Sequence, residues 1–333
     1  MGNLPAALDV PLRIPAIASP MFIASGPELV KAECQAGMIG SFPTLNARPD
    51  SLLAEWFDEI NESNAAYAAA HPEDPVAPVA ANLIVHRTNN RLDHDLGVVV
   101  DKKVPIVITS LGAREEVNEA VHSYGGVVLH DVINDRFARK AIEKGADGLI
   151  PVAAGAGGHA GSQSPFALVR EIRNWFDGPV ALSGAIAHGR SVLAARATGA
   201  DFAYIGSALL STPEANVVED YRNMIVDSGA DDIVYSNLFT GVHGNYLKGS
   251  IRGAGLDPDN LPSSDPSAMS FSTRADGERE VKAWKDIWGS GQGVGSITAS
   301  VPAGDLIRRF ADEYEQAKRD FVAEVLGADL AGV

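Results

Sequence analysis

One histidine stands in a stretch of the chain that carries almost no other functional side chain. His159 lies in the segment Ala153–Gly161, whose sequence is AAGAGGHAG, directly after the apolar run Gly148–Val152. A loop of this composition cannot fill space with side chains, so its backbone can approach a flat ligand closely while the imidazole projects into the opening. An imidazole with an ordinary pKa of about 6.5 can take up or release a proton at neutral pH. The pattern predicts acid–base or substrate-positioning chemistry at His159.

Two glycine-containing turns later in the chain have the composition of an anion-binding site. Ser183-Gly184-Ala185 and Gly206-Ser207 each follow a short apolar run. Backbone N–H groups in such turns, together with the start of a following helix, can bind a phosphate. Either turn taken alone is equally well explained as a tight turn without a ligand. Their occurrence one after the other favours a phosphorylated ligand.

Polar residues also interrupt or end other apolar runs. Asn82 lies inside Val79–Val85, and Ser110 ends another run. A buried amide must find hydrogen-bond partners, which a ligand heterocycle or neighbouring loop backbone would provide. The first run ends in Ser19-Pro20-Met21, where the methionine either covers a ring or fills the core. We expect these side chains to face the same site as His159.

Eight apolar runs, most of them introduced by turn residues, are predicted to be the strands that position these groups. They are Pro15–Ser19, Met38–Phe42, Val79–Val85, Pro105–Ser110, Gly126–His130, Gly148–Val152, Pro179–Ser183 and Phe202–Gly206. Seven helical patterns separate them, at Pro27–Ala36, Leu52–Ile60, Leu92–Lys102, Arg114–Tyr124, Asp135–Lys144, Pro165–Phe176 and Arg190–Thr198, and several end at a glycine. Eight such units predict an α/β fold, a closed parallel (β/α)8 TIM barrel with its chemistry at the C-terminal strand ends. An open doubly wound sheet is the alternative.

The pattern changes after the eighth run, which suggests a division of the chain. Residues 1–215 are expected to form the barrel, with an insertion at about 50–78. Residues 216–305 contain a region rich in Gly, Pro, Ser and Asp that is expected to form a lid or substrate lobe over the barrel mouth. Residues 306–333 begin with an amphipathic pattern and are expected to form a helix packed back on the barrel.

Composition limits the partners. The 333 residues are 46% hydrophobic, which is enough to bury a large core, and they carry a formal charge of −16. This charge repels nucleic acid and anionic lipid. The single cysteine, Cys34, excludes an internal disulfide, and no apolar run reaches the roughly 18 residues of a membrane span. A cytoplasmic monomer or homodimer acting on a small molecule is expected, without nucleic-acid or membrane partners.

These residues resemble the nitronate monooxygenase family, formerly called 2-nitropropane dioxygenases, which also includes FMN-dependent enoyl-acyl-carrier-protein reductases and NADH:quinone reductases. The resemblance covers nearly the whole chain. It rests on Pro15 with Pro20-Met21, Asn82, the sequence AGGHAG at 156–161, Ser183-Gly184 with His188-Gly189, Ile205-Gly206-Ser207, and DIWGSGQGVG at 286–295.

The resemblance implies a barrel that holds FMN, with His159 facing the flavin as base or substrate-positioning group. The implied cofactor-binding residues are Ser19, Pro20, Met21, Asn82, Ser110, Gly157, Gly158, Ser183, Gly184, Ala185, Gly206, Ser207, Gln292 and Gly293. Three departures are present. The family usually has Gly-Gly at Ser183-Gly184, Gln or Gly at Ala18 or Ser19, and Gly-Thr-Arg-Phe at residues 206–209, so an arginine is missing here.

The expected reaction is oxidation of an alkyl nitronate with O2 to a carbonyl compound and nitrite. A nitronate is an electron-rich carbanion that FMN can oxidise without NADH, and a neutral His159 could also deprotonate a nitroalkane. One alternative is an NADH- or NADPH-dependent FMN reductase of quinones or enoyl thioesters, although the chain lacks a strand-to-helix GxGxxG motif. A second is a non-catalytic flavin- or phosphate-binding barrel. An aldolase is not favoured, because no proposed strand ends in lysine.

Other candidate substrate residues carry weaker signals. His130 ends the expected fifth strand, His243 lies between glycines of the lobe, and Tyr246 is an aromatic residue nearby. Structural roles are the competing explanation for each of them. No His-x-x-x-His or carboxylate spacing indicates a metal site.

Overall fold

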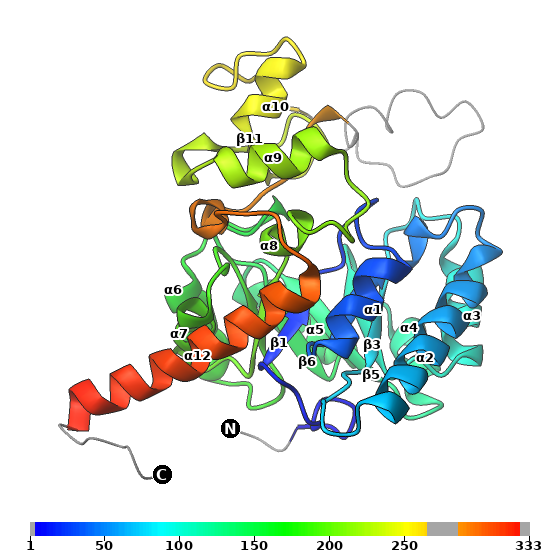
Figure 1. Cartoon of the computed structure of the whole chain (residues 1–333). Helices are drawn as coiled ribbons and strands as arrows, with labels where there is room; N and C mark the ends of the chain where they lie inside the picture. Colours follow the sequence, from blue (N-terminus) through cyan, green and yellow to red (C-terminus); the bar gives the residue numbers. More distant parts are fainter. Residues whose placement is uncertain (1–3, 265–285, 327–333) are drawn as a thin grey trace.

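Short apolar runs form the strands of a cylinder in the computed structural model, which describes residues 4–264 and 286–326. Strands and helices alternate along the chain up to residue 210, and the helices surround the strands (Figure 1). The eight strands of the cylinder are β1 (Ala16–Ala18), β2 (Gly40–Pro43), β3 (Val79–Ile84), β4 (Ile106–Ser110), β5 (Val127–Val132), β6 (Gly148–Pro151), β8 (Ala181–Ser183) and β9 (Phe202–Ile205).

Parallel pairing joins these strands in a ring. One sheet has the order β2-β3-β4-β5-β6 and the other has the order β1-β9-β8. A parallel bridge between Ile17 and Ile39 connects β1 to the residue before β2, and a bridge between Leu149 and Val180 connects β6 to the residue before β8. Both edges of the two sheets are therefore linked, and the predicted TIM barrel is confirmed.

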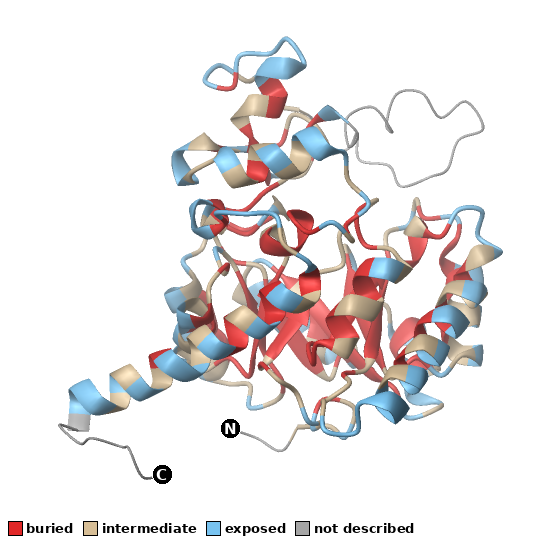
Figure 2. Ribbon diagram, viewed as in Figure 1, coloured by how far each residue is buried: buried red, intermediate tan, exposed pale blue. Residues whose placement is uncertain are grey.

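The strands bury side chains on both faces, as expected of a parallel barrel. In β4, Ile106 and Ile108 belong to the apolar cluster inside the cylinder, whereas Val107 packs in the layer between strands and helices. Leu8, 1% exposed, joins the inner cluster from the N-terminal segment. Figure 2 shows the buried residues concentrated on the strands and on the inner sides of the helices.

Most of the surrounding helices begin and end within a few residues of where the sequence predicts. They are α1 (Pro27–Gln35), α2 (Leu52–Ala70), α3 (Leu92–Asp101), α4 (Glu115–His122), α5 (Asp135–Glu143), α6 (Pro165–Arg173), α7 (Gly189–Thr198) and the short α8 (Ser207–Leu210), with the 3-10 helix η1 (Thr44–Asn46) after β2. Gly199 ends α7 with a φ of 107°, a left-handed conformation that favours glycine. The helix expected at Leu52–Ile60 continues to Ala70, so part of the expected insertion is an extension of α2.

A second layer lies over one end of the barrel (Figure 1). It contains α9 (Glu219–Asp227), the 3-10 helix η2 (Ala230–Asp232), β10 (Ile233–Ser236), β11 (Gly244–Leu247) and α10 (Lys248–Gly253). A small antiparallel sheet of order β10-β11-β7 ties it to the barrel, because β7 (Gly158–His159) comes from the loop after β6. From here on, the lobe means the residues from α9 to α10, which are part of the expected lobe at 216–305.

Two further elements return from the lobe to the barrel. The 3-10 helix η4 (Gln292–Ser296) contacts α8 and α9, and α12 (Ala303–Leu326) crosses the barrel against α1 and α7. The predicted C-terminal helix is therefore present up to Leu326. The rest of the expected segment, 327–333, lies outside the described residues. Among the helices that the structure describes, none has both the length and the apolar character needed to span a bilayer.

Candidate active site

A large cavity opens where the C-terminal ends of the barrel strands meet the lobe. Its volume is about 1330 Å³, larger than the roughly 300–1,000 Å³ of most small-molecule sites. Strand ends and the loops after them line it, together with Tyr221 and Trp288 from beyond the barrel. These two rings stack with centroids 5.0 Å apart. The cavity has room for a cofactor and a second molecule.

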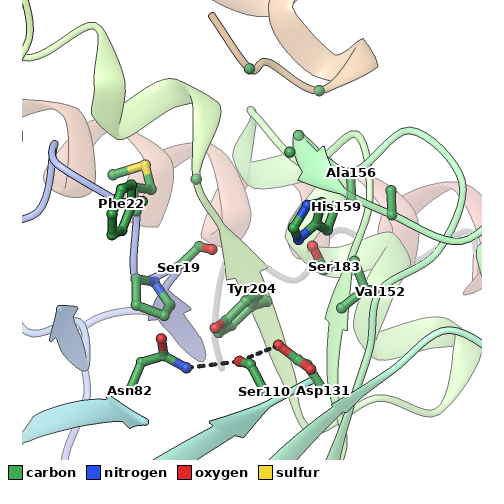
Figure 3. Close-up of a pocket in the computed structure, with 18 of the residues that line it drawn as sticks. Ser19, Phe22, Asn82, Ser110, Asp131, Val152, Ala156, His159, Ser183 and Tyr204 are labelled. Atoms are coloured by element: carbon green, nitrogen blue, oxygen red, sulfur yellow. Dashed lines mark hydrogen bonds between the residues drawn. The ribbon is translucent and has the colours of Figure 1, made fainter. Parts of the chain in front are cut away.

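His159 enters this cavity from β7. Figure 3 shows its ring among the residues that line the cavity. Its backbone pairs with Gly244 of β11, and its Nε2 lies 2.9 Å from Oγ1 of Thr240. The Thr240 hydroxyl also lies 3.0 Å from the carbonyl oxygen of Val242, to which it can donate, so the contact holds the ring through Nε2. Burial lowers the pKa of His159 to about 4, and the imidazole is therefore neutral at physiological pH.

A chain of polar side chains forms the floor of the cavity (Figure 3). Nδ2 of Asn82 donates to Oγ of Ser110 at 2.8 Å, and Oγ of Ser110 donates to Oδ2 of Asp131 at 2.6 Å. The second N–H of Asn82 is donated to the carbonyl of Ile108 at 3.1 Å. The expected amide and hydroxyl are thus brought together, and a carboxyl group joins them.

Asp131 was not predicted from the sequence, because strand β5 extends two residues past His130. Side chains alternate along β5, so Leu129 and Asp131 face the barrel interior and His130 faces outward. His130 borders the cavity but is only 6% exposed, and its Nδ1 lies 2.6 Å from Oγ1 of Thr109. Burial lowers the pKa of His130 to about 4 and raises that of Asp131 to about 6. Substrate contact at His130 remains a prediction.

The two predicted phosphate turns lie side by side, since β8 and β9 are paired and Ser183 is opposite Tyr204. After Ser183, Gly184 and Ala185 have φ values of 137° and 55°. A Cβ added to Gly184 would come within 2.9 Å of the Ala154 carbonyl oxygen, so this turn needs glycine. The helix that follows Gly206 is the four-residue α8, so most donors for a phosphate must come from the turns themselves.

The glycine-rich segment after Trp288 closes over these turns. The N–H of Gly291 donates to Oγ of Ser207 at 2.8 Å, and the N–H of Gln292 donates to the carbonyl of Gly155 at 2.9 Å. A Cβ on Gly293 would approach the carbonyl carbon of Ala185 to 2.8 Å. The side chain of Gln292 is exposed and does not line the cavity, so the contribution seen here is that of its backbone.

The neighbouring residues fit a flat, phosphorylated cofactor. Gly158 has a φ of 65°, and a Cβ there would meet no atom within 4 Å, so its surroundings are open. Ser19, Pro20 and Met21 line the wall beyond the floor, and Gly157 lines the cavity beside Gly158. A phosphate could be bound by the serine and glycine turns, and a ring system could rest against the polar floor. These features fit FMN.

Two expected substrate residues lie elsewhere. His243 is exposed and stacks on Tyr235 with centroids 4.9 Å apart. Tyr246 is 1% exposed and packs edge-on against Phe239 at 5.0 Å. Neither is among the residues that line the cavity. Aromatic packing within the lobe accounts for the position of each.

The rim carries side chains that sequence patterns did not single out. Ile133 and Phe137, 39% and 40% exposed, line it together with Lys140 of α5. On another part of the lining, the guanidinium of Arg48 lies 5.2 Å from the centroid of the Phe22 ring. The mouth of the cavity is therefore apolar and carries two cationic groups. Sequence periodicity alone would have assigned all of these residues to ordinary surface positions on helices and loops.

Comparisons with known proteins identify the family of the chain. A family model described as nitronate monooxygenase matches residues 9–313. A nitronate monooxygenase of Paraburkholderia phytofirmans is 26% identical, with 91% of this chain and 93% of that protein covered. One from Neurospora crassa is 27% identical over 62% of this chain and 58% of its own length.

Solved structures share the fold. FabK from Thermotoga maritima has a TM-score of 0.75 at 22% identity, with 96% of this chain and 97% of that chain covered. A nitroalkane oxidase from Streptomyces ansochromogenes also has a TM-score of 0.75 at 22% identity, with 95% and 100% covered. The likeness extends over the barrel and the lobe together.

Proposed function

Because the chain belongs to the nitronate monooxygenase family, we propose that it oxidises alkyl nitronates with O2, using bound FMN, to a carbonyl compound and nitrite. The resemblance stated from the sequence is confirmed, and the chain is an enzyme of a flavin-dependent oxidoreductase family. The specific reaction, the identity of the flavin as FMN and the role of His159 are the proposal.

One observation carries it: a half-buried, neutral imidazole shares a cavity with a serine- and glycine-lined cradle and a polar floor. His159 supplies the imidazole, Ser183 and Ser207 lie in the cradle, and Asn82 lies in the floor. FMN, when bound, supplies the acceptor for the substrate's electrons. The residues of the chain position the substrate and exclude water.

The state of His159 favours a nitronate over a neutral nitroalkane. A base whose pKa is lowered to about 4 is poorly suited to remove a proton from carbon. An anionic nitronate beside the ring instead favours the protonated imidazole, because opposite charges stabilise each other. The protonated ring would donate a hydrogen bond to a nitro oxygen of the nitronate. We therefore propose that His159 positions and charge-matches the nitronate.

A second candidate function is reduction of a quinone or an enoyl thioester with NADH or NADPH. The cavity volume of about 1330 Å³ favours it, because a small nitronate beside a cofactor would leave part of this space unused. The apolar rim at Ile133 and Phe137 would suit a longer substrate. The two reactions differ in their need for a nicotinamide.

An aerobic assay separates these candidates. The FMN-loaded enzyme is given ethyl nitronate in an oxygen electrode, and nitrite is measured without any nicotinamide. We expect O2 consumption with nitrite release, and a much lower rate with freshly dissolved nitroethane. Absence of nitrite from the nitronate, together with rapid NADH or NADPH oxidation when a quinone or enoyl thioester is added, would favour the reductase instead.

A further inference from the structure

We propose that Asp131 meets the flavin ring as a neutral carboxylic acid and donates a hydrogen bond to it, so that FMN binding is coupled to the uptake of one proton. The inference rests on the proposed function, because it takes FMN as the occupant of the cavity. It assigns a role to the one residue of the polar floor that the sequence did not point to.

The direction of the hydrogen bonds in the floor is fixed. Both N–H groups of Asn82 are donated, to the carbonyl of Ile108 and to Oγ of Ser110. The single hydroxyl proton of Ser110 is donated to Oδ2 of Asp131. What these groups can still offer a ligand is Oδ1 of Asn82 and Oδ1 of Asp131. With Asp131 ionised, both are acceptors.

A flavin ring does not match such a floor. Its polar edge carries one N–H group and several acceptor oxygen and nitrogen atoms, so at most one acceptor of the floor finds a donor. When Oδ1 of Asn82 accepts from that N–H, an ionised Asp131 faces ring acceptors while losing its contact with water, and both effects disfavour the charge. Protonation turns Oδ1 of Asp131 into a donor, and the mismatch disappears. A buried carboxyl can be held neutral for this purpose.

The surroundings of Asp131 already favour the neutral form. Burial raises its pKa to about 6, and the hydrogen bond from Ser110 opposes this shift. The structure gives Asp131 no ion pair within residues 4–264 and 286–326. A ligand that covers the carboxyl removes more water, so the pKa rises further and a proton is bound near neutral pH.

The other titratable groups around the cavity do not account for the uptake of this proton. Tyr204 of β9 faces Asp131 with a pKa raised well above its usual value, so the phenol is neutral. The neighbouring strands β4 (Ile106–Ser110) and β6 (Gly148–Pro151) contain no ionisable side chain. His159 is neutral, and His130 lies on the outer face of β5. The remaining charges of the lining, Arg48 and Lys140, lie at the rim.

Flavin binding as a function of pH tests the proposal. The apoprotein is titrated with FMN, and separately with riboflavin, from about pH 5 to about pH 8, and flavin fluorescence is followed. The Kd of the wild-type protein for flavin is expected to be higher at high pH than at low pH. The total increase is about tenfold for each pKa unit by which flavin binding raises the pKa of Asp131. Asp131→Asn keeps an N–H donor at every pH, so its Kd should stay near the low-pH wild-type value. Asp131→Ala should bind weakly throughout.

Riboflavin and Ser110 provide the controls. Riboflavin lacks the phosphate, whose own titration is therefore removed from the comparison. Ser110→Ala removes the hydrogen bond that favours the ionised carboxyl, so the midpoint of the pH dependence should move to higher pH, and Ser110→Thr should restore it. Thermal melting shows whether each variant is folded.

The outcomes are distinct. Riboflavin binding that is tight but independent of pH in the wild type overturns the role of Asp131 alone. Weaker binding by Asp131→Asn than by the wild type at low pH overturns it as well, since it would mean that the carboxyl itself is required. If folded wild-type protein binds neither flavin, the proposed function fails and this inference fails with it.

Discussion

At the scale of single residues, His159 differs from a free histidine in two respects. Its Nε2 is fixed by Thr240, and burial has lowered its pKa to about 4. Both come from the loop that holds it, because β7 pairs with β11 and thereby brings Thr240 beside the ring. An anionic substrate beside the ring would raise the pKa of His159 again, whereas a neutral substrate would not. This property suits a nitronate.

Replacement of His159 tests this role. His159→Asn should retain FMN binding, because the ring is expected to contact the substrate and not the phosphate cradle. Turnover of ethyl nitronate should fall by about 10²–10³-fold, the usual cost of removing one hydrogen-bond donor that stabilises negative charge in the reaction. The readouts are steady-state kcat/KM and FMN fluorescence titration. His243→Asn is the matched control and should leave both unchanged, since His243 is exposed and outside the cavity lining. Full activity in His159→Asn would refute the assignment.

The residues found by sequence reasoning and the one that was missed have a common explanation. His159 is visible because glycines surround it, and Asn82 because it interrupts an apolar run. Asp131 was missed because β5 was expected to end at His130. The alternation from Val127 through Leu129 was the available signal, since it continues to Asp131 on the inner face.

At the scale of elements, close backbone contact between η4 and the turn after β8 shapes the cofactor cradle. Gly293 is the contact point, because a Cβ there would lie 2.8 Å from the carbonyl carbon of Ala185. Gly295, in the same 3-10 helix, is exposed, and a Cβ there would have its nearest contact at 3.7 Å, with Cα of Gly229. Gly293 and Gly295 therefore offer a test position and a matched control within one 3-10 helix.

Gly293→Ala should displace η4 from the cradle. We expect a loss of about 1–3 kcal/mol in the free energy of unfolding, the usual cost of overpacking, together with weaker FMN binding. Gly295→Ala should change stability by less than about 0.5 kcal/mol, as surface substitutions do, and should keep the wild-type Kd. Urea denaturation and FMN titration measure both effects. Equal behaviour of the two variants would contradict the packing described here.

The elements of the barrel could be predicted, whereas the small sheet of the lobe could not. Strand runs such as Val79–Ile84 carry apolar residues and turn boundaries, which are local signals. Strand β7 is two residues long and pairs with β11 far along the chain, and this pairing has no local periodicity. The helix expected at Leu52–Ile60 is also longer than its pattern indicated, since α2 continues to Ala70 into the expected insertion.

At the scale of the whole molecule, buried ionisable groups link stability to pH. His130 and His159 have folded-state pKa values of about 4, below their ordinary value of 6.5. The unfolded chain therefore binds these protons first, so the stability they contribute is complete above about pH 6.5 and is lost as the pH falls toward 4. The raised pKa of Asp131, about 6, has the opposite effect on stability. Its contribution is complete below the ordinary pKa of 3.8 and is lost as the pH rises through about 6.

His130→Gln isolates one of these contributions. The variant should be less stable than the wild type at pH 7, because the contact with Thr109 is altered. The difference should shrink by about 1–3 kcal/mol on acidification from pH 7 to about pH 4.5, since only the wild type loses the contribution of His130. Urea denaturation at the two pH values measures it, and the exposed His243→Gln provides a reference. A difference that stays constant would contradict the linkage.

The central claim is that a flavin in the barrel cavity accepts electrons directly from a nitronate positioned by His159. The FMN-loaded enzyme is mixed anaerobically with ethyl nitronate, and separately with NADH and with NADPH, while the visible flavin absorption is recorded. The account predicts rapid loss of this absorption with nitronate alone, and little loss with nitronate in His159→Asn. Unchanged absorption with nitronate, together with rapid bleaching by NADH or NADPH, would contradict it.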